Sequence, residues 1–277
     1  MPGTLYLVPT PIGNLSDLSQ RAERTLAEVD FIAAEDTRVS LKLLNHLGIR
    51  KPMVSYYRHN TQTSGPAIVD RLLAGECCAL VTDAGTPAVS DPGEDLVALC
   101  VRARVPVIAL PGPCALITAL AVSGLPTGRF TFEGFLPMNK KNRRRHLDSL
   151  RSEERTMIFY EAPHKLSDTL DDLAAAFGPD RPAVLCRELT KLHEEVLRTT
   201  LGGAAEHYRE TEPRGEFVLV VAGAPEREED APSLADAAER VLALREQGLS
   251  LRAAAKQVAG ETGLGKNELY QAALDLQ

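Results

Sequence analysis

Short apolar runs alternate with amphipathic segments through the first half of the chain. Apolar stretches this short, bounded by turn residues, are typical of strands buried on both faces of a parallel sheet. Helix signals between them include Ser16 as an N-cap, Gly48 as a stop, and Gly75 as the end of a helix over residues 67–74. The pattern predicts a first α/β domain over residues 1–125. Its expected strands are residues 4–8, 31–34, 53–56, 77–81 and 105–110.

The second half carries more strand signals and fewer helices. A helix is expected from about residue 163 to residue 177, and the mixture predicts an α+β domain over residues 126–224. The expected strands are residues 130–136, 156–160, 183–187, 195–201 and 216–222.

The last part of the chain changes character again. Residues 225–232 are acidic and flanked by proline, as in a linker. A tail over residues 233–277 follows, with helical patterns at 233–247, 250–259 and 266–274. Helices separated by glycine-containing turns resemble a helix-turn-helix, which would contact nucleic acid, although a packing or dimerisation module has the same pattern.

Charge and composition narrow the classes of function. The net charge of −7 over 277 residues argues against a chain that coats nucleic acid along its whole surface. Residues 137–151 nevertheless hold six basic residues and one acid, Asp148. This segment is either a solvated helix start or flexible arm, or a contact for a phosphate backbone.

Other features point to a cytoplasmic protein with no membrane attachment. No apolar run approaches the roughly 18 residues of a membrane span, and no basic leader precedes the first strand. The five cysteines are odd in number and lack zinc spacing, so free thiols and no metal site are expected.

The loop over residues 82–93 is the strongest single sign of a ligand site. It follows an apolar strand and combines glycine, proline and two acids, Asp83 and Asp91. Glycine permits close backbone approach to a ligand and proline stiffens the loop, although a tight capped turn is the plain alternative. No Gly-x-Gly-x-x-Gly follows a strand, which disfavours a Rossmann dinucleotide site. The prolines of residues 111–113 suit a neutral or cationic ligand better than a phosphate.

Seven motifs lie in order along the chain: PTPIGNL at residues 9–15, AEDTR at 34–38, DAGTP at 83–87, SDPG at 90–93, PGP at 111–113, EAPHK at 161–165 and RELTK at 187–191. In order and spacing they resemble those of the tetrapyrrole methylase superfamily. Within it, they are similar to the branch that methylates small-subunit ribosomal RNA. The resemblance implies two α/β domains with a cofactor cleft between them, S-adenosylmethionine as cofactor, and a homodimer. It also implies 2′-O-methylation of a cytidine in the decoding region of the 16S rRNA, free or in the 30S subunit.

Carried over by position, the resemblance also implies a set of cofactor contacts made mostly by backbone and small side chains. Cys114 stands where relatives are expected to have a hydroxyl, which puts a hydrogen bond there in doubt. The implied contacts are Ile12, Ala84, Gly85, Thr86, Val89, Cys114, Ala115, Glu161, Ala162, Glu188, Leu189, Ala222 and Gly223.

Methyl transfer to a ribose hydroxyl needs alignment and removal of one proton. Glu35 and Asp36 leave the second strand where ligands gather in open α/β sheets, so they are the first choices for the base, with helix capping as the alternative. His59 follows the third strand and is the next catalytic candidate. Four further groups are weighed for the same role: Asp83, Asp91, Glu161 and His164.

RNA contacts are expected from the basic segment and from the start of the helix near residue 163. The residues are Lys140, Lys141, Arg143, Arg144, Arg145, His164 and Lys165. Two other hypotheses stay open, a methylase of a tetrapyrrole or other small molecule and a non-catalytic nucleotide-binding protein. The non-catalytic protein is distinguished from either methylase by whether labelled methyl groups ever leave the cofactor.

Overall fold

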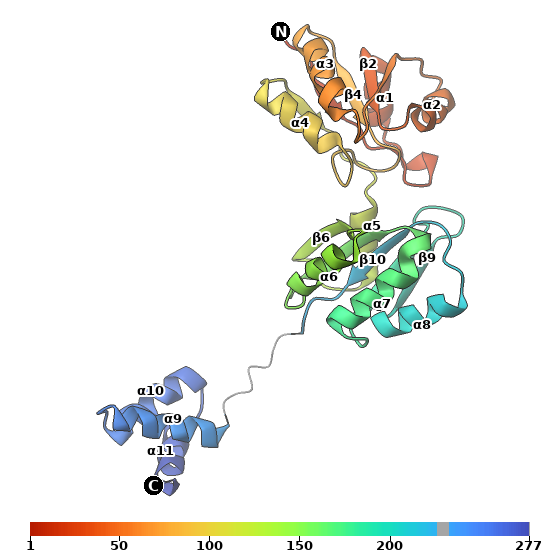
Figure 1. Ribbon diagram of the computed structural model, residues 1–277. Coiled ribbons are helices and arrows are strands. Elements are labelled where there is room, and N and C mark those ends of the chain that lie inside the picture. The colour runs from red at the N-terminus through yellow and green to blue at the C-terminus, as the bar shows by residue number, and fades with distance from the viewer. Residues whose placement is uncertain (226–232, 277) are drawn as a thin grey trace. The chain divides into compact units, whose positions relative to one another are not determined.

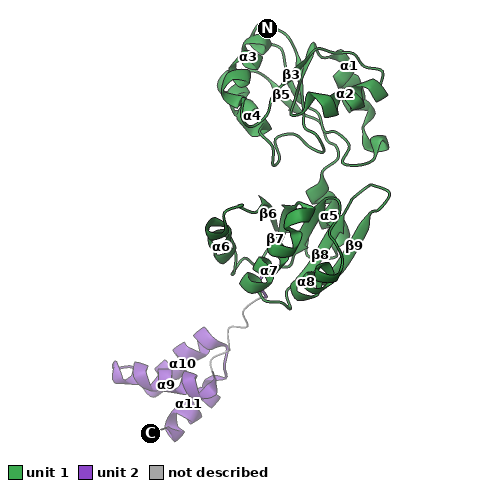
Figure 2. Cartoon of the chain, turned by 45° about the vertical axis from the view of Figure 1, so that its right-hand side comes forward, with its two compact units in different colours: residues 1–223 green, residues 224–277 purple. Residues whose placement is uncertain are grey.

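The computed structural model describes residues 1–225 and 233–276, which fall into two compact units, residues 1–223 and residues 224–277 (Figure 1, Figure 2). Of the expected linker, residues 225–232, only Pro225 is described. Within the described residues, no helix is long and apolar enough to cross a membrane.

The first sheet is parallel throughout, with strand order β3-β2-β4-β1-β5. Alternate residues of the fully buried strands enter separate cores on the two faces, as Phe31 and Ile32 do. This double burial explains the unbroken apolar runs and confirms the predicted parallel sheet. The strands are β1 (Leu5–Leu7), β2 (Phe31–Ala34), β3 (Met53–Ser55), β4 (Cys78–Val81) and β5 (Val107–Ala109).

Two helix boundaries differ from expectation. Ser19, not Ser16, caps the first α-helix, because Asn14 caps a separate 3-10 turn, η1 (Leu15–Asp17), before it. Helix α3 begins at Thr61 and continues through Pro66, with buried Gly65 packed toward Leu99 of the next helix. Tertiary packing here outweighs the local breaking tendency of a Gly-Pro pair. The helices are α1 (Gln20–Glu28), α2 (Thr37–His46), α3 (Thr61–Leu73) and α4 (Gly93–Arg102).

The second sheet is mixed, with strand order β6-β7-β10-β8-β9. Only β6 and β7 run parallel, and the other neighbours are antiparallel. The strands lie where the sequence predicts them. They are β6 (Phe130–Phe135), β7 (Thr156–Glu161), β8 (Pro182–Arg187), β9 (Glu195–Thr200) and β10 (Phe217–Val221).

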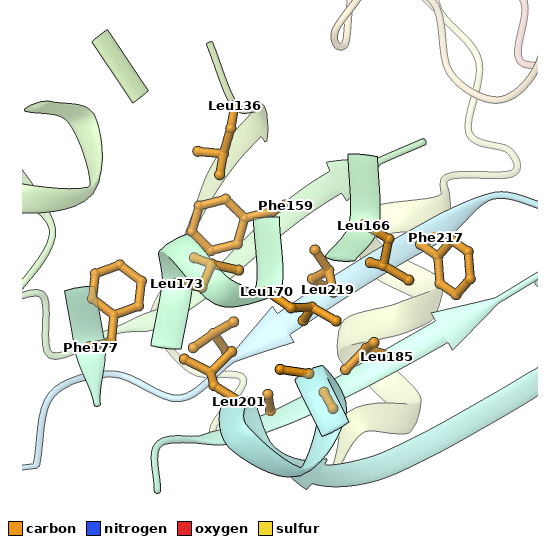
Figure 3. Packing of buried hydrophobic residues seen from close by; sticks show 14 of the residues in the cluster. Leu136, Phe159, Leu166, Leu170, Leu173, Phe177, Leu185, Leu201, Phe217 and Leu219 are labelled. Atoms are coloured by element: carbon orange, nitrogen blue, oxygen red, sulfur yellow. The ribbon is translucent and has the colours of Figure 1, made fainter. Parts of the chain in front are cut away.

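Three helices cover one face of this sheet. Leu166, Leu170 and Leu173 from α7 pack over Phe159 of β7 and neighbouring strand residues (Figure 3). Helix α8 joins this core, although the sequence pattern predicts no helix between residues 201 and 216. The elements on this side are α6 (Lys140–Ser149), η2 (Pro163–Lys165), α7 (Leu166–Phe177) and α8 (Leu201–Glu210).

The opposite face is covered by α5 (Ala115–Ser123), which corrects the expected domain boundary at residue 125. Leu116, Ala119 and Leu120 pack against β7, β8 and β10 rather than against the first sheet. Helix α5 is apolar on nearly all sides, so its sequence shows no preferred partner. The chain therefore passes from the first sheet to the second before residue 115.

The C-terminal unit has its own core. Helices α9 (Leu234–Glu246), α10 (Leu251–Thr262) and α11 (Lys266–Asp275) pack around alanines, Val241, Val258 and Leu269. Ser233 and Ser250 cap the first two helices through hydrogen bonds to backbone amides.

Candidate active site

A cavity of about 500 Å³ receives residues from both sheets of the first unit. On the first-sheet side, it is lined where the parallel strands end and their loops begin, the usual ligand edge of such a sheet. Tyr160, Glu161 and Ala162 line it from the second sheet, at the end of β7.

Backbone bridges hold the first-sheet loops together beneath the cavity. Thr10 and Gly85 exchange two backbone hydrogen bonds of 2.9 and 3.0 Å. The Thr86 hydroxyl donates to the Pro113 carbonyl at 2.8 Å. Three loops that are distant in the sequence therefore form one rigid floor.

Asp91 organises the loop over residues 82–93. Its Oδ1 accepts from the backbone N–H groups of Ala88 at 3.0 Å and Gly93 at 2.7 Å. These bonds support left-handed backbone at Ala88 and Ser90, with φ of 65° and 68°. Non-glycine residues in this conformation are strained, and such strain gathers at functional sites. Within the described residues, Asp91 Oδ2 is buried without a hydrogen-bond partner.

The two adjacent acids after β2 have separate environments. Asp36 caps α2, accepting from the Arg38 backbone N–H at 2.8 Å, and its ion pair with the Arg38 side chain lowers the pKa of Asp36 to about 2. Glu35 lines the cavity, and its Oε2 accepts from the Thr82 hydroxyl at 2.8 Å. Asp36 thus has the capping role that was the alternative to catalysis, and it does not line the cavity.

The Asp83 side chain links the loop after β4 to the loop after β2. Its Oδ1 accepts from the Asp36 backbone N–H at 3.1 Å, while the residue also lines the cavity. Burial raises the pKa of Asp83, and the nearby negative charges of Glu35 and Asp36 act in the same direction.

Glu161 is almost fully buried and its carboxylate is occupied by local partners. Oε1 accepts from the Ala162 backbone N–H at 2.8 Å, and Oε2 accepts from the Thr169 hydroxyl at 2.6 Å. Because both oxygens of its carboxylate have local partners, we infer that Glu161 stabilises the end of β7 and does not act as the catalytic base.

Ten of the thirteen expected cofactor contacts line the cavity, and Glu188, Ala222 and Gly223 do not. The Glu188 carboxylate is instead engaged by Lys191 Nζ at 2.8 Å and by the Glu216 backbone N–H at 3.0 Å. The ten that line it are Ile12, Ala84, Gly85, Thr86, Val89, Cys114, Ala115, Glu161, Ala162 and Leu189.

Ala222 and Gly223 lie at the wrong end of their strand for the cavity. Strand β10 runs antiparallel to β7, so Phe217 pairs with Glu161 while Val221 pairs with Met157. The start of β10 therefore reaches the cavity, where Glu216 and Phe217 line it.

Sequence reasoning missed several lining residues, among them Phe135, Tyr160 and Glu216. Tyr160 directly precedes the EAPHK motif, so adjacency to a motif was the available signal. Phe135 and Glu216 carried no local signal, because strand register and direction bring them to the cavity.

The charged residues of the lining are mostly acidic. Lys191 is the one cation among them, and its ammonium is held between Glu188 and Glu216. Such a site favours a ligand that carries positive charge. The lining carboxylates are Glu35, Asp83, Asp91, Glu161 and Glu216.

The basic segment folds as helix α6, and its arginines divide between two faces. Arg143 is only 12% exposed and pairs with Asp172 of α7 at 2.5 Å. Lys140, Lys141, Arg144 and Arg145 are exposed. Arg143 is therefore a packing residue, which corrects its grouping with the RNA contacts.

The three histidine and lysine candidates outside α6 are not among the residues that line the cavity. His59 is exposed in a turn after β3, with its ring 6.4 Å from that of Tyr57. His164 and Lys165 belong to η2, just beyond Pro163, which does line the cavity.

The sequence matches two family models. Residues 4–205 match the Tetrapyrrole (Corrin/Porphyrin) Methylases, and residues 232–277 match the RsmI C-terminal HTH domain. Solved structures with this fold include a uroporphyrin-III C-methyl transferase from Thermus thermophilus complexed with S-adenyl homocysteine. It has a TM-score of 0.58 and 20% identity, and the match covers 79% of this chain and 97% of that one. A diphthine synthase has a TM-score of 0.61 at 16% identity, covering 79% and 90%.

Full-length relatives are much closer in sequence. A ribosomal RNA small subunit methyltransferase I from Synechocystis is 49% identical, over 99% of both chains. The protein of the same name from Escherichia coli O157:H7 is 48% identical, over 99% of this chain and 96% of its own length. The chain therefore belongs to the ribosomal RNA small subunit methyltransferase I family of the tetrapyrrole methylases.

Proposed function

We propose that this protein transfers a methyl group from S-adenosylmethionine to small-subunit ribosomal RNA, at the 2′ oxygen of a cytidine in the decoding region. The observation that carries the proposal is the acidic cavity on a floor of tied backbone loops, in a chain whose relatives share its full length and bear the name of an rRNA methyltransferase.

The cavity suits S-adenosylmethionine in size and charge. Its volume of about 500 Å³ lies within the usual range of cofactor pockets. The cofactor's sulfonium and ammonium groups are cations, which match the lining carboxylates. Gly85, Ala84 and Ala115 allow close approach of backbone polar groups.

When bound, the cofactor supplies an electrophilic methyl group. The residues of the cavity floor hold it in place, and alignment with the ribose oxygen in a site that excludes water accounts for most of the expected acceleration. Glu35 is our choice for the group that receives the ribose proton, because it lines the cavity and Thr82 orients its carboxylate.

RNA contact is assigned to the exposed cations of α6, with His164 and Lys165 as neighbouring candidates. Lys140, Lys141, Arg144 and Arg145 follow β6, whose last residue, Phe135, lines the cavity. Cationic side chains there neutralise phosphates and release condensed counterions.

The experiment is to incubate the purified protein with methyl-labelled cofactor and small subunits that lack the modification. We expect label in rRNA and a site resistant to alkaline cleavage, because a methylated 2′ oxygen cannot attack the adjacent phosphate. The Glu35→Gln variant is the matched control. Label on a base, or transfer only to a tetrapyrrole, would contradict the proposal.

A further inference from the structure

Phe135 is an exposed aromatic ring in the lining of the cavity. Its exposed fraction of 55% is the highest of any phenylalanine or tyrosine within residues 1–225 and 233–276. A large apolar ring held in water at the edge of a polar cavity is a candidate contact for a ligand.

A β-bulge directs Phe135 toward this side of the sheet. The register of β6 against β7 shifts between Phe132 and Gly134, so that Phe132 pairs with Ile158 and Phe135 pairs with Tyr160. Ile158 and Tyr160 are two residues apart and lie on the same face of the sheet, so Phe132 and Phe135 share that face. Without the extra residue in β6, Phe135 would lie on the other face of the sheet.

The bulge depends on glycine. Gly134 has φ of 61°, in the left-handed region, and an added Cβ would lie 3.2 Å from Ser90 Oγ of the cavity loop. Strand β6 thus approaches the loop that forms the cavity floor, and residue 134 must be small and left-handed for this approach.

The ring is held by other aromatic groups. Tyr160 meets Phe135 edge-on at 5.6 Å and Phe132 edge-on at 4.9 Å. The Tyr160 hydroxyl accepts from the Leu116 backbone N–H at 3.1 Å, which fixes it to the start of α5. Phe135 is therefore preorganised, with one part of its surface packed and the rest open to solvent.

The surroundings of the ring suit a nucleotide. Met138 is 80% exposed three residues later, and the exposed cations of α6 begin at Lys140. Single-stranded nucleic acid is bound by aromatic platforms for the bases together with cations for the phosphates, and both features adjoin here.

We propose that Phe135 is the stacking platform for the base of the target nucleotide, extruded from its RNA stack so that its ribose enters the cavity. This role rests on the proposed function. In this role Phe135, which is the last residue of β6 and lies outside the loops of the cavity floor, makes the enzyme specific for an unpaired nucleotide.

The chain has no tryptophan, so Phe135→Trp introduces a single fluorescent reporter at the platform. The indole can stack as phenylalanine does, so we expect its emission to be quenched by a single-stranded, cytidine-containing RNA oligonucleotide. S-adenosylhomocysteine alone should leave most of the emission unchanged. The control is Val101→Trp, at the 63% exposed end of α4, where the same RNA should produce no quenching.

Phe135→Leu, which keeps an apolar side chain but removes the ring, should weaken RNA binding roughly 5- to 150-fold with cofactor affinity unchanged, and Phe135→Tyr should restore it. Quenching by the cofactor analogue alone, or equal RNA affinity in wild type and Phe135→Leu, would overturn the platform. The fluorescence assay does not require methyl transfer. Absence of rRNA methylation by the wild type would therefore overturn the proposed reaction, whereas an unquenched indole would overturn the stacking.

Discussion

Glu35 and Asp36 are neighbours at the end of one strand, but their side chains have different partners. Asp36 is bound to the first turn of its own helix and to Arg38, whereas Glu35 reaches the cavity lining and contacts Thr82. Position at the ligand edge of a sheet is thus insufficient to define a catalytic group, since a carboxylate engaged by a helix N-terminus and an arginine is a poor proton acceptor.

Substitution separates the two roles. Glu35→Gln should lower kcat roughly 100-fold or more with the unfolding temperature nearly unchanged, because general-base catalysis contributes about 10²–10⁴-fold. Asp36→Asn should retain most activity and lower the unfolding temperature through loss of the ion pair. Steady-state kinetics and calorimetry of both variants test this, and equal loss of kcat would contradict the assignment.

Asp83 gives a pH-dependent prediction. Burial raises its pKa, so its carboxyl group takes up a proton at a higher pH than an ordinary aspartate does. A cationic cofactor favours the ionised form, and its affinity should therefore fall as the pH decreases from neutral through this raised pKa.

Calorimetric titration with S-adenosylmethionine across this pH range measures the effect. The Asp83→Asn variant should bind more weakly at neutral pH and show a smaller pH dependence. An unaltered pH profile in this variant would indicate that another group is responsible.

At the scale of elements, helix α6 combines a packing face and an exposed cationic face. Arg143 and Asp172 join α6 to α7, with side chains 12% and 15% exposed, while Arg144 and Arg145 are exposed. A triple substitution of all three arginines would confuse loss of stability with loss of RNA binding.

We expect Arg143→Ala to lower the free energy of unfolding by about 2 kcal/mol, between the values for exposed and fully buried pairs. Arg144→Ala/Arg145→Ala should leave stability within about 0.5 kcal/mol. The double variant should instead reduce the salt dependence of RNA binding. The slope of the logarithm of RNA affinity against the logarithm of salt concentration should become shallower by roughly 1 for each phosphate that is no longer neutralised. Urea unfolding and RNA titrations at several salt concentrations distinguish the variants, and an unchanged slope would exclude both arginines as phosphate ligands.

At the scale of the whole molecule, the cavity is built entirely within the first unit, whereas α9, α10 and α11 enclose a separate core. A chain ending at Pro225 should therefore bind S-adenosylmethionine within about 2-fold of the full-length affinity, because every residue that lines the cavity belongs to the first unit, which has its own cores. Calorimetry of both proteins tests this, and loss of cofactor binding would show that the tail supports the cavity. RNA contact by the tail and the homodimer both remain predictions, the latter open to sedimentation analysis.

Much of the fold was predictable because its signals are local. The apolar runs at residues 31–34 and 77–81 identified strands buried on both faces, and the glycines and prolines of residues 82–93 identified the ligand loop. The ten expected contacts that line the cavity came from the resemblance to a family: seven lie inside its motifs, and Val89, Cys114 and Ala115 lie beside them. Helix α5 was assigned to the first domain because an almost wholly apolar helix has no face that indicates its partner.

The sequence by itself determined the strands, several helix ends, the ligand loop and the family of this protein, since each depends on residues close together in the chain or on recognisable motifs. Only the tertiary structure decided that β10 runs antiparallel to β7, that a bulge turns Phe135 to the cavity side, and that Arg143 is paired with Asp172. These features depend on register and on contacts between distant segments, where a shift of one residue reverses the face of a strand and the local composition stays the same.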